Sequence, residues 1–215
     1  MSASAVGRAE PSEPFAAWSR QRQAASLGLW IFLASETVFF GALLLGYAVY
    51  RYLYSDAFQA AGGHTNIWFG TANTAILLTS SATMALAAWA APEGLRRAAL
   101  WGLGLTAALG AAFLVVKGFE YREDIREHLV PGTAAFPLEP PETQIFFSFY
   151  WLLTGVHAVH LTIGIGAVLA VLRLVALGRI DWTRAGTMHA LALYWHLIDV
   201  VWIVLFPLLY LMGRG

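Results

Sequence analysis

Five long apolar runs constrain this chain more than any other feature of its sequence. They cover residues 27–50, 67–91, 98–116, 146–172 and 188–212. At about 1.5 Å per residue, each run is long enough to cross a hydrocarbon layer of roughly 30 Å as an α-helix. Of the 215 residues, 59% are hydrophobic and 12% are charged, against about 25% charged in soluble domains. The sequence therefore predicts an all-α, polytopic membrane protein with a bundle of five transmembrane helices, and it excludes a water-soluble domain.

The segments outside the runs predict the organisation of the chain. Residues 1–26 are polar and contain no apolar stretch, so we expect a surface tail rather than a cleaved signal peptide, followed by one membrane domain over 27–215. Residues 117–145 begin with dense mixed charge and end with three prolines. This pattern predicts a helical extension of the third span, followed by an extended loop.

Basic residues predict the orientation of the bundle. With the N-terminus inside, the inner segments carry eight arginines and the outer segments five basic residues. Because cytoplasmic loops are enriched in Lys and Arg, we expect a cytoplasmic N-terminus and a periplasmic C-terminus.

Two carboxylates, Glu36 and Asp199, lie inside the predicted spans. Each costs roughly 2.5–3.5 kcal/mol at mid-membrane, so both need a partner or a task. In the expected topology they lie about 14 and 16 Å from the inner face, and His160 lies at about 18 Å. His196 precedes Asp199 by three residues, on the same helix face. An intramembrane polar cluster of Glu36, His160, His196 and Asp199 is therefore predicted, either as hydrogen bonding between helices or for proton, lipid or subunit contact.

Three further patterns concern packing. Trp195 and Trp202 lie too deep for an interfacial belt, so we expect them to pack against protein. Pro207 is expected to kink the last span near its outer end. Small residues four apart predict close packing of the fourth span against a neighbour; they are Thr154, Ala158, Thr162 and Gly166.

The composition also limits which metal, nucleic-acid and cofactor sites the chain can form. The chain has no cysteine and no net formal charge, which excludes thiolate metal sites and gives no basic face for nucleic acid. Histidines on the fourth and fifth spans leave one alternative of another class, an independent haem- or quinone-binding redox protein. Spacing allows a single haem between His160 and His196.

The fifth span, residues 194–202, reads YWHLIDVVW and is similar to the YWHxxDxxW signature of cytochrome c oxidase subunit III. The resemblance continues, in the same order along the chain, through residues 35–40, 73–74, 120–121 and 154–160. The family motif positions are Asn73, Glu120, Gly155, His157, Tyr194, Trp195 and Trp202.

This resemblance implies a non-catalytic subunit of a haem-copper oxidase in a bacterial cytoplasmic membrane, part of aerobic respiratory electron transport. Haem and metal would belong to the partner, catalytic subunit I, and none to this chain, which would have no catalytic, metal or cofactor residues. The family packs against that subunit and others, binds phospholipid and supports proton uptake; its intramembrane glutamate falls on Glu36 and its His-Asp pair on His196 and Asp199.

Two departures from the family are visible. Full-length members have seven spans and this chain resembles the last five, so the lipid sites of the missing pair are not carried over. The short form and its ending also resemble a NorE-like branch associated with nitric oxide reductase. The sequence leaves open the oxidase or the reductase as partner, and the electron donor.

Overall fold

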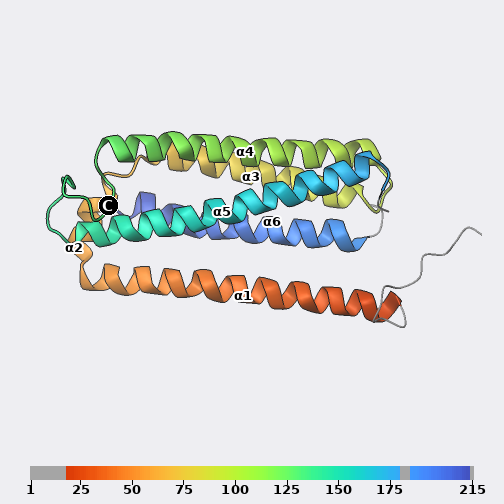
Figure 1. The fold of residues 1–215 in the computed structure, drawn as a ribbon, viewed down its shortest axis with the longest axis horizontal. Coiled ribbons are helices and arrows are strands. Elements are labelled where there is room, and N and C mark those ends of the chain that lie inside the picture. The colour runs from red at the N-terminus through yellow and green to blue at the C-terminus, as the bar shows by residue number, and fades with distance from the viewer. Residues whose placement is uncertain (1–17, 180–184, 214–215) are drawn as a thin grey trace, which may run out of the picture. The chain divides into compact units, whose positions relative to one another are not determined.

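The computed structural model describes residues 18–179 and 185–213. These residues form six α-helices and a π-helical end, and no strand (Figure 1). The elements are α1 (Trp18–Leu53), α2 (Ser55–Gly62), α3 (Ile67–Ala90), α4 (Arg96–Arg126), α5 (Thr143–Ala176), α6 (Ala185–Phe206) and η1 (Pro207–Leu211). The all-α prediction is confirmed.

The chain divides into two compact units, residues 1–38 and 39–215. In the first, α1 begins at Trp18, and residues 1–17 of the predicted tail lie outside the described part of the chain. The Oγ of Ser35 donates to the Phe32 carbonyl at 2.7 Å, and that of Thr37 to the Leu33 carbonyl at 2.8 Å. These back-bonds satisfy both hydroxyls within the helix, which makes them tolerable in an apolar environment.

The second unit is a helical bundle in which α3 packs along α4 and α6, and α5 packs on the same two helices (Figure 1). Glycines allow the closest approaches. A Cβ added at Gly102 would lie 2.8 Å from the Ala87 Cβ, and one added at Gly110 would lie 2.9 Å from the Trp195 ring. Small residues at such positions let helix backbones approach, which is how membrane helices gain packing energy.

Four helical stretches are long and apolar enough to cross a membrane: 23–53, 96–126, 143–176 and 186–211. They contain most of the predicted first, third, fourth and fifth spans. The predicted second span forms α3, 24 residues long, whose Asn, Ser and Thr side chains lower its hydropathy. Large apolar side chains also face outward, for example Trp101, 71% exposed. An outer surface of this kind fits contact with lipid rather than water.

Several packing predictions can be compared with these helices. The third span does continue as a helix to Arg126. Trp195 and Trp202 are fully buried, as predicted. The last span changes from α- to π-helix at Pro207; the kink predicted at this residue stays a prediction.

The predicted stripe of small residues on α5 is only partly buried within this chain, since Thr154 is buried and Ala158 is half-buried. Thr162 and Gly166 are exposed, and nothing lies within 4 Å of a Cβ added at Gly166. The buried face carries Leu161, Gly164 and Val168 instead. Residues four apart advance by about 40° around a helix of 3.6 residues per turn, so a stripe of four such residues rotates by about 120° and leaves the interface.

Candidate functional site

His196 and Asp199, here called the His196 pair, lie together on α6 as their spacing predicted. The His196 Nδ1 is 3.6 Å from Asp199 Oδ2 and 2.9 Å from the Oγ of Ser81 on α3. Asp199 is 4% exposed, and neither of its carboxylate oxygens has a hydrogen-bond partner among the described residues. The His196 side chain is 37% exposed. The pair therefore joins a buried, unsatisfied acid to a half-exposed imidazole.

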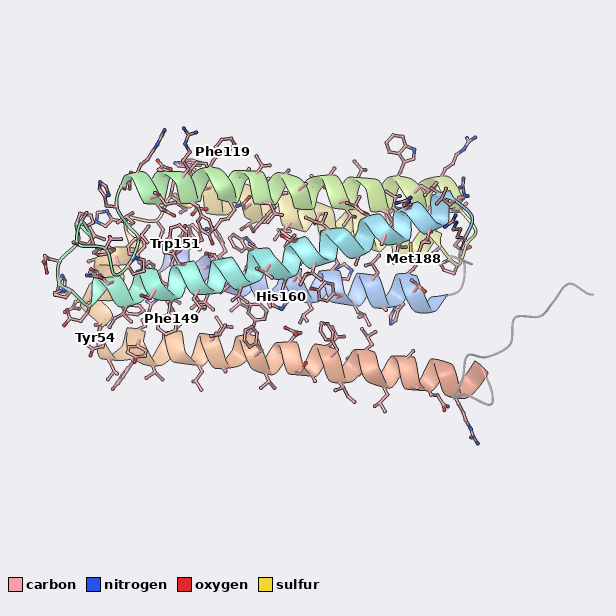
Figure 2. All side chains as sticks on the ribbon, viewed as in Figure 1. Tyr54, Phe119, Phe149, Trp151, His160 and Met188 are labelled. Atoms are coloured by element: carbon pink, nitrogen blue, oxygen red, sulfur yellow. The ribbon has the colours of Figure 1, made fainter. Side chains whose placement is uncertain are left out.

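His160 lies on α5 (Figure 2) and makes contacts of a different kind. Its Nδ1 is 2.8 Å from the Val156 carbonyl, and its own carbonyl accepts from the Tyr194 hydroxyl at 3.0 Å. Its ring packs on Phe40, with centroids 5.1 Å apart. Glu36 belongs to the first unit. The grouping of Glu36 and His160 with the His196 pair stays a prediction.

The two tryptophans of the family motif bind α6 to α3. The Trp195 Nε1 donates to Ser80 Oγ and the Trp202 Nε1 donates to Thr74 Oγ1, both at 3.1 Å. Their spacing of seven residues places both indoles on one helix face, since seven residues make about two turns. The motif thus builds two interhelical hydrogen bonds.

Other motif positions are buried without such bonds. His157 packs between Phe113 and Trp202, with ring centroids 5.5 and 5.1 Å away. Neither ring nitrogen of His157 nor the side-chain amide of Asn73 has a hydrogen-bond partner in the described part of the chain. A Cβ at Gly155 would meet the Tyr121 hydroxyl at 3.9 Å, an ordinary contact.

A second polar site lies where α4, α5 and η1 meet. We call it the Lys117 cluster; its members are Lys117, Glu120, Asp124, Tyr150 and Tyr210. All five side chains are at most 5% exposed. The three charged residues occupy positions i, i+3 and i+7 of α4, which share one helix face. That face is turned into the bundle.

The Lys117 ammonium is fully used by the cluster. Its Nζ donates to Glu120 Oε2 at 3.0 Å, to the Tyr150 hydroxyl at 3.0 Å and to the Tyr210 hydroxyl at 2.7 Å. It also lies 4.9 Å from the centroid of Tyr121, whose ring stacks on that of Trp151; Trp151 is labelled in Figure 2. Aromatic faces stabilise a buried cation. The site therefore holds a buried charge with every ammonium hydrogen paired.

The two tyrosines connect the acids. The Tyr210 hydroxyl donates to Glu120 Oε1 at 2.7 Å. The Tyr150 hydroxyl lies 2.9 Å from Glu120 Oε1 and 2.8 Å from Asp124 Oδ2. The cluster thus fastens α4 to α5 and to η1 through one continuous network.

The π-helix aims Tyr210 at this network. A Cβ at Gly70 of α3 would lie 2.8 Å from the Tyr210 ring, so glycine makes room for it. The freed carbonyls at the end of the helix are bound by side chains: Tyr47 donates to the Leu208 carbonyl at 2.7 Å and Thr65 to the Leu209 carbonyl at 3.1 Å.

Most of the Lys117 cluster was missed from the sequence. Glu120 was a motif position, but Lys117 and Asp124 were assigned to a charged extension entering the interface, and the two tyrosines were not singled out. The 117, 120, 124 spacing was the available signal. Among the described residues, no three His, Asp or Glu side chains gather as a metal site.

Comparison with known proteins places these residues in a family context. The family model described as "Cytochrome c oxidase subunit III" matches residues 19–214. The chain is 33% identical to cytochrome bo(3) ubiquinol oxidase subunit 3 of Pseudomonas aeruginosa, over 86% of this chain and 84% of that protein. It is 31% identical to cytochrome c oxidase subunit 3 of Corynebacterium diphtheriae, over 96% and 98%, and 31% identical to quinol oxidase subunit 3 of Bacillus spizizenii, over 88% and 87%.

Proposed function

The chain belongs to the cytochrome c oxidase subunit III family, and on that premise we propose that it is the non-catalytic subunit III of a haem-copper terminal oxidase. The observation that carries the proposal is the match of residues 19–214 to the family model. Relatives named for cytochrome c and for quinol oxidases support the oxidase class while leaving the electron donor open. In this role the chain carries no haem or metal, which belong to the partner catalytic subunit.

We further propose five membrane spans, with α3 as the second. α3 is 24 residues long and packs along both α4 and α6, and its hydroxyls are back-bonded: the Oγ1 of Thr74 donates to the Gly70 carbonyl and that of Thr79 to the Ala75 carbonyl, both at 2.8 Å. Such bonds lower the cost of hydroxyls in lipid. The proposed N-terminus is cytoplasmic and the C-terminus periplasmic, in a bacterial cytoplasmic membrane, with a tail over 1–26 and one domain over 27–215.

The His196 pair is the proposed contact with the catalytic subunit. A buried carboxylate without hydrogen bonds is costly, and its neighbour His196 is 37% exposed. Because Asp199 is only 4% exposed, a polar group on the partner's transmembrane surface would bond to the exposed side of the His196 ring, which in turn contacts Asp199. Glu36 and His160 are proposed to join the same intramembrane polar set, in proton, lipid or subunit contact.

Phospholipid binding is proposed at an open pocket of about 610 Å³ formed by the ends of α1 and η1. Leu44, Ala48 and Leu208 line its apolar part, and Arg51 and Tyr52 line it nearer the end of the span. The contact of the Arg51 Nη1 is with the Met212 sulfur, at 2.6 Å, and sulfur is a weak acceptor. A lipid phosphate would pair better with the guanidinium.

The test is extraction of the full chain in mild detergent, with mass spectrometry and optical spectroscopy of what co-purifies. We expect a catalytic subunit with haem and copper. Non-haem iron in the partner would assign the chain to the nitric oxide reductase branch instead. A stoichiometric reduced-minus-oxidised haem band in the isolated, reconstituted chain would overturn the subunit assignment and favour the redox-protein alternative.

Two variants test the polar set within that complex. We expect Glu36→Ala and Asp199→Leu to weaken association or shorten the working life of the oxidase, with unchanged haem content. Asp56→Asn, on the short helix α2, is the matched control. Unchanged assembly, activity and turnover stability in both variants would leave hydrogen bonding between helices as their sole role.

A further inference from the structure

We propose that the Lys117 cluster is a proton-binding site: Glu120 and Asp124 hold one proton between them through the Tyr150 hydroxyl, the proton resides on Asp124, and it exchanges through a surface pocket beside α4. The inference goes beyond the subunit role and rests on five side chains of this chain alone. Its failure would leave the proposed function untouched.

The hydrogen count at Tyr150 carries the first step. A phenol has one hydrogen to donate, yet its oxygen lies 2.8 Å from Asp124 Oδ2 and 2.9 Å from Glu120 Oε1. Lys117 also donates to the Tyr150 oxygen, at 3.0 Å. That hydrogen lies between the ammonium and the phenol, so it fills neither the Tyr150–Asp124 contact nor the Tyr150–Glu120 contact. Two ionised carboxylates would leave one oxygen–oxygen contact without a hydrogen. One of the two acids must therefore donate to Tyr150.

The contacts of Glu120 place that proton on Asp124. Glu120 Oε2 accepts from the Lys117 ammonium at 3.0 Å, and its Oε1 accepts from Tyr210 at 2.7 Å. These bonds stabilise an ionised carboxylate. Protonated Asp124 then donates to Tyr150, which donates to Glu120. Every short contact of the network contains one hydrogen in this arrangement.

Charge balance leads to the same count independently. All three charged residues of the cluster are at most 5% exposed. With both acids ionised, one cation would face two anions and a net negative charge would be buried, which is strongly unfavourable. With one proton added, Lys117 and Glu120 form a pair and the cluster is neutral.

Asp124 is also the member that reaches the surface. It lines an open pocket of about 220 Å³ together with His64, Asn66, Glu123 and Glu127. The Asn66 amide donates to Glu123 Oε2 at 3.3 Å, which holds one acid at the rim. These polar groups give water a route to the Asp124 carboxyl, so its proton exchanges without unfolding of the bundle.

Titratable groups surround Asp124 on each element packed near it. They are Lys117, Glu120, Tyr121, Glu123 and Glu127 on α4, Tyr150 on α5, Tyr210 on η1 and His64 before α3. The acids at the rim favour retention of the proton on Asp124, while Lys117 opposes it. Because Lys117 also pairs with Glu120 at 3.0 Å, its charge is shared between the two acids.

Infrared spectroscopy of the full chain, in its complex or in nanodiscs, tests the proposal at neutral pH, where ordinary aspartic acids are ionised. The measurement is the difference between the wild-type spectrum and that of each variant. We expect Asp124→Asn to remove one protonated-carboxyl band, Asp124→Glu to restore a band at a shifted frequency, and Glu127→Gln at the pocket rim to leave the band in place. A wild-type band unchanged in Asp124→Asn would overturn the proposal.

Two further measurements cover an Asp124 variant that does not fold. Tyr150→Phe removes the bridging oxygen, so we expect the carboxyl band to shift; an unshifted band would overturn the bridge. In D₂O, the band of the folded wild type should move while the helix amides stay protected. Exchange of the band only upon unfolding would overturn the pocket route.

Discussion

The Lys117 cluster and the His196 pair are both buried polar sites in one bundle, yet they are completed in opposite ways. In the cluster, the ammonium has three acceptors from three helical elements. In the pair, the Asp199 oxygens have no hydrogen-bond partner among the described residues, and His196 is half-exposed. The first site is closed by the chain itself, and the second is open toward something outside it. A buried polar site whose hydrogen bonds are all made within the chain thus indicates a role in stability. A site with unsatisfied groups indicates contact with another molecule.

The largest effect is expected from opening the closed site. Lys117→Met leaves buried acids without their cation, and removing one partner of a buried pair costs about 3–5 kcal/mol. Denaturant unfolding of the purified chain in micelles should show this loss of stability. The matched control is Arg97→Gln, on the exposed first turn of α4. Equal stability of the two variants would mean that the cluster does not hold the helices together.

A smaller loss is expected from removing one hydroxyl of the cluster. Tyr210→Phe removes one hydroxyl that bonds to Lys117 and to Glu120. Because the Lys117–Glu120 ion pair remains, we expect a total loss of about 1.5–3 kcal/mol. The same unfolding assay should place this variant between wild type and Lys117→Met. A loss as large as that of Lys117→Met would show that Tyr210 acts through packing of η1 as well.

Substitution in the His196 pair should affect partner binding more than the stability of the isolated chain. Asp199→Leu removes an unsatisfied buried acid, so we expect the stability of the isolated chain to change by less than about 1 kcal/mol or to rise, since apolar replacement of buried charge is often neutral or stabilising. Retention of the partner subunit should fall in the same variant. A large loss of stability in the isolated chain would show that the site is closed internally, and the comparison would fail.

The smallest effect is expected at a neutral bond between helices. Ser80→Ala removes the acceptor of the Trp195 indole; bonds of this kind average about 0.6 kcal/mol in membranes. Unfolding should resolve a small loss, with Thr79→Ala, whose hydroxyl is exposed and back-bonded, as the control. A loss of stability above about 2 kcal/mol would show that the indole bond contributes as much as a bond of the Lys117 cluster.

The long helices and their apolar character could be predicted because hydropathy is local. The helical extension to Arg126 and the burial of Trp195 and Trp202 followed from the same local patterns. The Lys117 cluster could not, because Tyr150 and Tyr210 lie 33 and 93 residues beyond Lys117 and only packing brings them together. In the sequence, a lysine at the end of an apolar run looks like a residue at the membrane interface. Only the spacing of residues 117, 120 and 124, which puts the three charges on one face of α4, indicates a buried cluster instead.

The small-residue stripe leaves the buried face of α5 after Ala158 for a geometric reason, since a repeat of four drifts around the helix. The His196 pair succeeded because an i, i+3 contact is fixed by the helix alone.

The position of Tyr210 has a consequence for how the protein is made. Its hydroxyl completes the coordination of an ammonium that left the ribosome 93 residues earlier. At about 5–20 residues per second, the Lys117 segment waits roughly 5–20 s for its last partner. During that interval the charged face of α4 has an incomplete set of bonds. Only a chain translated through η1 can therefore complete the set of bonds around Lys117.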